Sequence, residues 1–363
     1  MTTQSLFSFF TDPILRAPTL GCMLMSLAAS LMGVIVFLRK QSLIGEALSH
    51  AAYPGLMIGV MGAGLLSLPE NAELSLTFMT LGGAFCTALC GLWAIRFLEI
   101  RMRVPSDAAL CFVLSTFFGI GLTLASDLQF SFSALYKQGL TYLYGQAATM
   151  TDGHVFLYGT LACMVIIVIV LLYKELQLIT FDRQYAESIG IPVGPINALL
   201  FFLVALSVII GIRSVGVVLM SAMLIMPAVS ARQFTHRLSI LLVLAGFFGM
   251  VSGFVGNYLS VEITDLLARL YPAARLVLPT GPMIVLVAAT ISGLSLLFAP
   301  ERGLTVRLWR IARFRYTCIC ENLLKAMWRR GPKTLVSLNE LSDYQPISRP
   351  YLIFLVRRMI QQG

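Results

Sequence analysis

Glu46 and His50 are the two residues of this sequence best placed to bind a cation. They lie four residues apart in an apolar run, and one helical turn brings such residues to the same helix face. A carboxylate oxygen and an imidazole nitrogen together suit first-row divalent metal ions. The alternative is hydrogen bonding between packed helices, a common role of polar residues within membranes. Because ionisable residues at membrane depth usually face a cavity, a partner or a cation, we favour a metal pathway.

The helix that carries this pair is expected to break directly after it. Pro54 and Gly55 follow, and Pro54 lacks the N–H that would continue the helical hydrogen bonds. With a cytoplasmic start near Gln41 and a rise of about 1.5 Å per residue, Glu46 and His50 would lie roughly 8–14 Å into the bilayer. The pattern therefore predicts a broken, metal-compatible membrane helix.

The composition predicts an all-α polytopic membrane protein. Of 363 residues, 58% are hydrophobic and 12% charged, and the mean hydropathy is +0.86, which excludes an ordinary soluble domain. The pair of apolar runs on either side of Arg213 is short and could form one discontinuous element. No basic segment followed by a cleavage site opens the chain, so no cleaved signal peptide is expected. Apolar runs of spanning length predict about nine transmembrane helices (eight to ten), near residues 18–38, 44–66, 74–98, 107–126, 153–173, 195–212, 214–231, 238–259 and 280–299.

The distribution of basic residues predicts the orientation of these helices. By the positive-inside bias, the N-terminus is expected outside and the C-terminus in the cytoplasm. The inner loops would hold Arg39, Lys40, Arg96, Arg101, Arg103, Lys174, Arg183, Arg232 and Arg237, and the outer loops would hold Arg16, Lys137, Arg213, Arg269 and Arg275.

The sequence divides into a transmembrane domain, residues 1–300, and a basic cytoplasmic tail, residues 301–363. The tail has twelve Lys/Arg and four Asp/Glu, a net charge of 12 − 4 = +8, which suits anionic lipid headgroups or nucleic acid. Residues 312–330 predict a basic helix, and two later helices, from 335 and from 347, resemble a helix-turn-helix. A winged-helix DNA reader would continue into a β-hairpin, so we favour packing on the membrane face or on a partner.

A polar segment over residues 181–192 predicts a two-turn helix between two spans on the inner side. Asp182 is a good N-cap, Gly190 is a good C-terminal stop, and Pro192 cannot continue a helix. Taken alone, this is a solvated connector. Between its two ends lie Arg183, Tyr185 and Ala186.

Two further segments stand out within the spans. Over residues 213–232, methionines recur every three residues, and a thioether row could suit Cu(I), although packing is the favoured interpretation. Pro227 is expected to break this span. These methionines are Met220, Met223 and Met226. Over residues 278–289, a rigid outer turn is expected to start the last span, formed by Pro279, Gly281 and Pro282.

Some chemistry is excluded by missing motifs. There is no G-x-x-x-x-G-K-[ST] loop for ATP, no H-E-x-x-H, and no evident Ser/His/Asp constellation. The seven cysteines form no framework, and Cys86 and Cys90, which share a helix face, are assigned to packing rather than metal binding. His154 and His236 lie at span ends and are interpreted as interfacial.

These segments resemble those of the membrane permease subunits of the zinc/manganese/iron class of bacterial ABC importers (ABC-3 type). Residues 39–55 resemble the family's acid, S-H-A and P-G segment, although the family often has Asp in place of Glu46. Residues 181–192 resemble its cytoplasmic coupling segment, and residues 215–231 its V-G-V-x-L-x-S-A-x-L-I-x-P-A run. Residues 278–289 resemble its final S/T-G-P stretch. The tail resembles the start of a metal-dependent repressor of the DtxR kind.

The resemblance implies a permease subunit, not itself an enzyme, of an ATP-driven importer of manganese, zinc or iron in the bacterial inner membrane. The metal would pass Glu46 and His50, with no permanently bound cofactor. Implied partners are a cytoplasmic ATP-binding subunit, an extracytoplasmic metal-binding protein, membrane lipid and a second permease, identical or different; nucleic acid is not expected. The alternatives are an ion-gradient-driven secondary transporter and a membrane-tethered regulator acting through its tail. The implied ATPase-coupling residues are Asp182, Arg183, Tyr185, Ala186 and Gly190.

Overall fold

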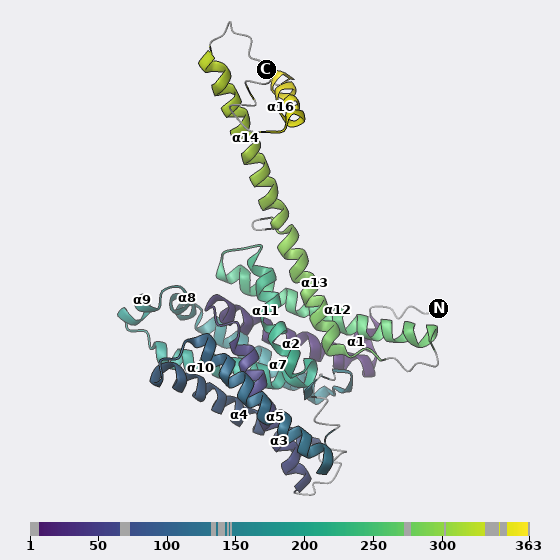
Figure 1. Ribbon diagram of the computed structural model, residues 1–363. Helices are drawn as coiled ribbons and strands as arrows, with labels where there is room; N and C mark the ends of the chain where they lie inside the picture. The colour runs from purple at the N-terminus through teal and green to yellow at the C-terminus, as the bar shows by residue number, and fades with distance from the viewer. Residues whose placement is uncertain are drawn as a thin grey trace. The chain divides into compact units, whose positions relative to one another are not determined.

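The computed structural model of the chain describes residues 7–65, 73–131, 136, 142–143, 145, 147–271, 277–300, 303–330, 341 and 347–361. Within these residues the regular secondary structure is helical, and no strand occurs (Figure 1). The chain divides into two compact units, Met1–Ser295 and Leu296–Gly363. We call the first the membrane unit and the second the tail unit.

Each of the nine predicted spans is a helix, which confirms the prediction of an all-α polytopic membrane protein. Seven of the described helices are long and apolar enough to cross a membrane. The two others are α3, which carries Glu46 and His50, and α11, whose 16 residues span about 24 Å against roughly 30 Å of hydrocarbon. The nine are α2 (Pro13–Leu38), α3 (Ile44–Leu65), α4 (Glu73–Arg101), α5 (Ser106–Ser131), α7 (Asp152–Leu171), α10 (Val193–Val215), α11 (Val217–Arg232), α12 (Leu238–Leu270) and α13 (Thr280–Phe298).

Short elements connect these spans. A four-residue helix, α1 (Ser8–Thr11), precedes α2, and a 3-10 turn, η1 (Ala147–Thr149), precedes α7. Between α7 and α10 the chain forms α8 (Tyr173–Phe181) and α9 (Arg183–Ser188), which lie at one end of the helix bundle (Figure 1). As predicted, α13 begins at a turn that contains Pro279, and Pro282 lies in its first helical turn.

The central helix of the membrane unit is α2, which packs against α7, α10, α11 and α12. Glycines bring these helices together until their backbones touch. A Cβ added to Gly33 would lie 1.8 Å from the backbone oxygen of Leu224 on α11. A Cβ on Gly253 of α12 would lie 2.6 Å from the backbone oxygen of Cys22. Small residues at helix crossings are typical of membrane bundles, where packing and not hydrophobic burial drives association.

α10 and α11 are two separate helices, and α10, with 23 residues, is by itself long enough to cross a membrane, so the alternative of one discontinuous element is not what forms. The break lies at Gly216, whose φ of 98° falls in the region that favours glycine.

Pro227 does not break α11, so this prediction was wrong. The helix continues through Pro227 to Arg232. The backbone oxygen of Met226, next to the proline, accepts from the hydroxyls of Ser230 at 2.8 Å and of Ser292 on α13 at 2.9 Å. Pro227 deprives the Met223 oxygen, four residues earlier, of its helical donor, so these two bonds brace the proline-containing turn and do not replace the lost bond.

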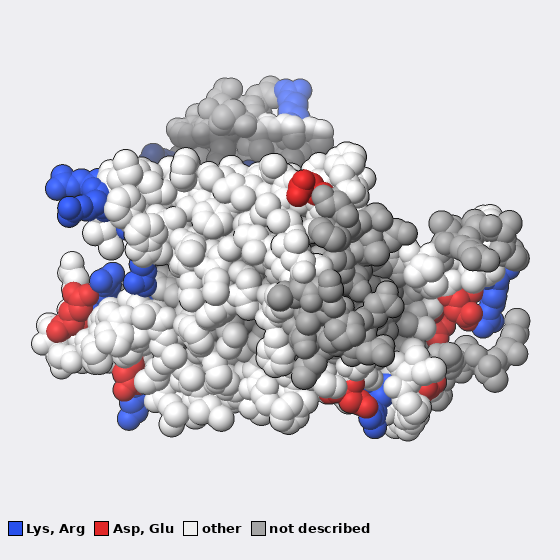
Figure 2. All heavy atoms as spheres, turned by 90° about the horizontal axis from the view of Figure 1, so that it is seen from below, with Lys and Arg blue, Asp and Glu red and all other residues white. Residues whose placement is uncertain are grey.

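Charged side chains of the membrane unit gather toward its two ends. Figure 2 shows a face on which Lys, Arg, Asp and Glu lie mostly at the left and right, while uncharged residues make up most of the broad area between. This is the distribution expected of a bundle that crosses a bilayer, because charge at the bilayer centre is costly.

The tail unit contains α14 (Leu304–Arg330) and α16 (Arg349–Gln361). The helices predicted over residues 312–330 and from residue 347 are therefore present. Most of the helix predicted from residue 335 lies outside the described residues, so the helix-turn-helix stays a prediction. The unit has a small core of its own, formed by Leu323, Ala326, Leu341, Leu352 and Leu355.

Candidate metal-transit and coupling sites

A tight turn between α2 and α3 sets the position of Glu46 and His50. α2 ends in a Schellman motif, in which Lys40 takes the left-handed conformation with a φ of 59°. The Lys40 N–H donates to the Phe37 oxygen at 3.0 Å, and the Gln41 N–H donates to the Val36 oxygen at 3.1 Å. These bonds satisfy the last carbonyls of α2 and reverse the chain.

Glu46 lies in the first turn of α3 and His50 lies one turn later, on the same side of the helix, as predicted. Because α3 begins at Ile44, the two residues lie about 3 Å and about 9 Å along the helix from its start.

The imidazole of His50 is buried against α5. Its side chain is 8% exposed, and its ring meets Phe118 edge-on, with ring centroids 4.6 Å apart. Nδ1 has no hydrogen-bond partner among the described residues. A buried nitrogen without a partner costs free energy, so it needs a reason. Glu46, one helical turn earlier, is partly exposed.

The expected break of α3 at Pro54 does not occur. The helix continues to Leu65, so the prediction of a broken helix was wrong. Close packing supports it on two sides. A Cβ on Gly55 would lie 2.1 Å from the Gly83 oxygen of α4, and a Cβ on Gly121 of α5 would lie 3.1 Å from the Pro54 nitrogen. Neighbouring helices hold the proline-containing turn in place, as they often do in membranes.

Glu46 and His50 gain no third ligand of the usual kind from the described part of this chain, where no group of three or more His, Cys, Asp or Glu gathers. The methionine row belongs to the core, as favoured: Met220 and Met223 are fully buried and Met226 packs against them. His154 binds the Thr151 hydroxyl through Nδ1 at 2.8 Å at the start of α7.

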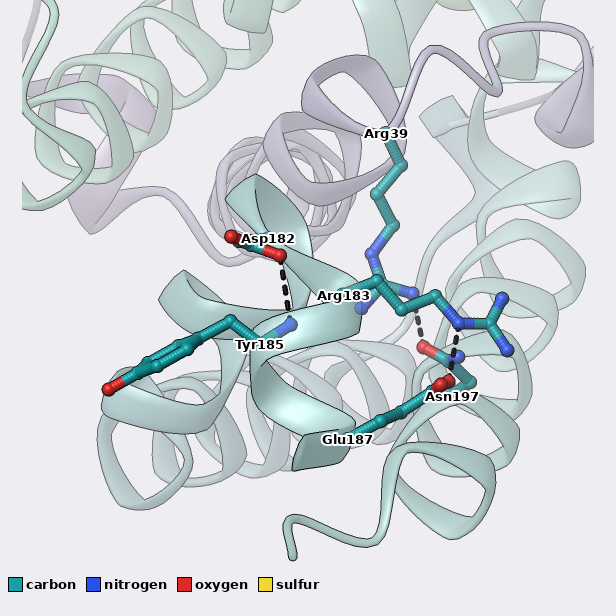
Figure 3. A network of polar contacts seen from close by, with 6 residues as sticks. All are labelled: Arg39, Asp182, Arg183, Tyr185, Glu187 and Asn197. Carbon is teal, nitrogen blue, oxygen red and sulfur yellow. Dashed lines mark hydrogen bonds and ion pairs between the residues drawn. The ribbon is translucent and has the colours of Figure 1, made fainter. Parts of the chain in front are cut away.

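The predicted coupling helix is α9, and its two ends are built as the sequence indicated. The Asp182 carboxylate accepts from the Tyr185 N–H at 2.9 Å, which caps the first turn (Figure 3). Gly190, with a φ of 85°, closes a second Schellman motif. In that motif the Gly190 N–H donates to the Glu187 oxygen at 3.2 Å and the Ile191 N–H donates to the Ala186 oxygen at 3.1 Å.

The coupling residues divide into an inner and an outer group. Ala186 is fully buried in the core of the membrane unit and anchors α9 to it. Three apolar side chains along the segment point to solvent: Phe181 is 60%, Tyr185 is 53% and Ile189 is 51% exposed. Sequence reasoning picked Tyr185 but missed Phe181 and Ile189, although each lies four residues from it.

Arg39 lies beside the coupling segment, which the sequence gave no reason to expect. Its Nη1 donates to Oδ1 of Asn197 on α10 at 2.7 Å, and Arg183 lies close by, paired with Glu187 at 2.9 Å (Figure 3). From the sequence, Arg39 was expected only as an inner-loop charge, and Arg183 as an inner-loop charge and a coupling residue.

The chain is similar to a known protein family, to curated proteins and to solved structures. The model of the ABC 3 transport family matches residues 11–299. The chain is 38% identical to a probable metal transport system membrane protein of Chlamydia pneumoniae, over 91% of this chain and 73% of that protein. It is 34% identical to the manganese transport system membrane protein MntC of Bacillus subtilis, over 91% of this chain and 71% of that protein. It is 35% identical to the zinc transport system membrane protein TroC of Treponema pallidum, over 85% of this chain and 97% of that protein.

The fold is also known from solved structures. PsaBC from Streptococcus pneumoniae, solved with a Fab, matches with a TM-score of 0.68 over 83% of this chain and 98% of that chain, at 23% identity. The tail, residues 301–363, holds 363 − 300 = 63 residues. The alignment with the Chlamydia pneumoniae protein covers 91% of the chain, so it extends into the tail. The chain belongs to the ABC 3 transport family and is a multi-pass membrane permease subunit, in which ATP hydrolysis falls to a separate protein.

Proposed function

We propose that the chain imports a divalent transition metal, manganese, zinc or iron, as the permease of an ATP-driven transporter. The single observation that carries the cargo class is the set of relatives, which are named for manganese, zinc and probable iron transport. The donor types at the candidate site fit each of these metals, because a carboxylate and an imidazole bind all of them. Family membership favours ATP-driven transport over the alternative of an ion-gradient-driven carrier.

In this proposal the metal passes Glu46 and His50 on α3. The support is the buried, unpartnered Nδ1 of His50 with a carboxylate one helical turn away. The other ligands would come from water, from backbone oxygens or from a second permease subunit. The double variant Glu46→Ala/His50→Ala is expected to insert normally and to lose uptake of radioactive manganese and zinc in cells that also hold the partner subunits.

The matched control replaces His154, which binds within the α7 cap, by Ala. It removes an imidazole but leaves the proposed pathway intact, so uptake is expected to stay near the level of the unchanged chain. Uptake that persists in the double variant, at equal membrane content, rejects the transit site without touching the family assignment.

The ATP-binding subunit is proposed to dock on the exposed apolar side chains of the coupling segment, Phe181, Tyr185 and Ile189. An apolar helix surface that enters a groove is a common recognition mode. Because Ala186 is buried, a bulky residue there would disturb the fold before it disturbed docking. Tyr185→Asp is the sharper test, since it adds charge to a side chain that is already exposed.

Tyr271 provides the matched control. It directly follows α12, and its side chain is also exposed, at 60%. Tyr185→Asp is expected to abolish co-purification of the ATP-binding subunit, while Tyr271→Asp leaves it unchanged. Equal recovery of that subunit with both variants would remove the docking role from α9.

The remaining partners follow from the same proposal. An extracytoplasmic metal-binding protein would deliver the metal, and a second permease, identical or different, would complete the pathway in the bacterial inner membrane. The C-terminus would then lie in the cytoplasm.

A further inference from the structure

A cavity of about 570 Å³ lies where five parts of the membrane unit meet. The α2–α3 turn, the end of α4, the start of α5, the α8–α9 junction and the start of α10 all contribute to its lining. Four charged side chains line it: Arg39, Arg96, Arg183 and Glu99. It is distinct from the proposed metal site, since neither Glu46 nor His50 lines it.

The lining charge is positive, with three arginines and one glutamate, 3 − 1 = +2. The Glu99 carboxylate, which offsets one of these positive charges, accepts from the Ser106 hydroxyl at 2.6 Å. Arg96 lies over the Phe201 ring at 5.0 Å from the ring centroid, and within the described part of the chain Arg183 is the one lining arginine with an ion pair, to Glu187. The cavity therefore favours an anion.

Of the arginines that line the cavity, Arg39 has the greatest need of an anionic partner. Its Nη1 is bound to Asn197, but Nε and Nη2 are buried and have no hydrogen-bond partner among the described residues. Burial, and then the neighbouring Arg183 guanidinium, lower the pKa of Arg39. A partly buried cation with two buried, unused donors and a like charge beside it is costly until an anion accepts those hydrogen bonds. Two parallel N–H groups of a guanidinium match the geometry of a phosphate.

The rest of the lining is mixed. Its polar side chains are Gln41, Ser106, Thr180 and Asn197, and its apolar ones include Leu92, Ile95, Ile100 and Leu110. On α4, Trp93 is 69% exposed and stacks on Phe97, with ring centroids 5.4 Å apart. Tryptophan typically marks the level at which a membrane helix meets the headgroups. An anion held here would therefore lie at headgroup depth with hydrocarbon surface beside it.

We propose that this cavity binds an anionic phospholipid, whose phosphate is held by Arg39, Arg96 and Arg183 and whose acyl chains lie along the partly exposed Leu92 and the exposed Ile100. A soluble phosphate shares the headgroup chemistry but makes no use of the apolar lining. Basic pockets between membrane helices are known to bind anionic headgroups. Since Arg183 is the first residue of α9, the lipid would brace the coupling segment.

The test is lipid binding to the full chain, purified in neutral detergent and titrated with phosphatidylglycerol or phosphatidylcholine, with bound lipid counted by native mass spectrometry. Phosphatidylglycerol is expected to bind the more tightly. Arg39→Gln and Arg96→Gln should each weaken it about fivefold, the effect of one basic group near an anionic headgroup. Arg101→Gln, which removes an exposed arginine of α4 outside the cavity, is the control and should leave binding unchanged.

Arg39→Lys separates charge from folding: it keeps the charge and should retain more phosphatidylglycerol than Arg39→Gln at the same melting temperature. Equal binding in Arg39→Gln and Arg101→Gln would overturn the proposal. Complete displacement of phosphatidylglycerol by millimolar inorganic phosphate would also overturn it, in favour of a soluble anion. None of these measurements depends on transport, so the outcome is independent of the proposed metal import.

Discussion

Asn197 binds Arg39 across a sequence separation of 158 residues, with Nη1 and Oδ1 2.7 Å apart. The bond joins the turn that precedes α3 to the first part of α10, directly after the coupling segment (Figure 3). Along the chain, Arg39 is followed by α3 with Glu46 and His50, and Asn197 is preceded by α9 and Gly190. The bond therefore joins the turn that leads into the proposed transit site to the helix that follows the proposed docking segment.

Asn197→Ala should destabilise the membrane unit. It leaves a third donor of the partly buried Arg39 guanidinium without a partner, which costs about 1–3 kcal/mol. Thermal unfolding of the purified chain in detergent measures the effect. The control is Gln184→Ala, on the exposed side of α9. A melting temperature that falls equally in both variants would show that the contact adds nothing to stability.

Two equivalent turns allow opposite predictions. Gly190 and Lys40 both occupy the left-handed position of a Schellman motif, with φ of 85° and 59°. A side chain in this conformation costs about 1–2 kcal/mol relative to glycine. Gly190→Ala should therefore lower the melting temperature and Lys40→Gly should raise it. Because a Cβ on Gly190 would meet open space, any loss there reflects the backbone alone. Shifts of the same sign in both variants would contradict this account.

The crossing of α3 and α4 should tolerate no side chain at Gly55. Its added Cβ would lie 2.1 Å from the Gly83 oxygen, so Gly55→Ala must push the helices apart, at about 1–3 kcal/mol for overpacking. Gly82→Ala is the control, since a Cβ there would meet nothing within 4 Å. Both variants are compared by melting temperature and by the amount of chain recovered from membranes. A neutral Gly55→Ala would mean that the crossing is looser than described.

The orientation of the chain can be measured directly. The positive-inside bias predicts a cytoplasmic C-terminus. A fluorescent protein fused after Gly363 should be bright, and an alkaline phosphatase fused there should be inactive, since that enzyme needs the periplasm to form its disulfides. The reverse pattern would place the tail and α9 outside and reject docking of a cytoplasmic ATPase.

The helices were predictable from the sequence because long apolar runs and caps are local signals. Asp182 and Gly190 marked both ends of α9 correctly. The prolines misled, because local chemistry predicts a break at Pro54 and Pro227. Contacts from distant helices, at Gly83 and Ser292, hold those turns instead. No local pattern announces such contacts.

The same limit applies to the sites. The spacing of Glu46 and His50 is a local fact, and it placed them correctly on one side of α3. That Ala186 faces inward, and that Arg39 meets Asn197 and Arg183, depends on how helices far apart in sequence assemble. Charge counting assigned those two arginines to loops and could not show that they share a cavity.

The close glycine contacts of the bundle also limit which helices can separate from one another during transport. Where a missing side chain lets two backbones touch, as at Gly33 with Leu224 and at Gly55 with Gly83, there is nothing to rotate aside. We therefore expect α2 and α11 to move as one body, and α3 and α4 likewise. When the pathway changes from facing one side of the membrane to facing the other, the helices must separate at interfaces filled by flexible side chains. His50 lies at such an interface, between α3 and the Phe118 ring of α5.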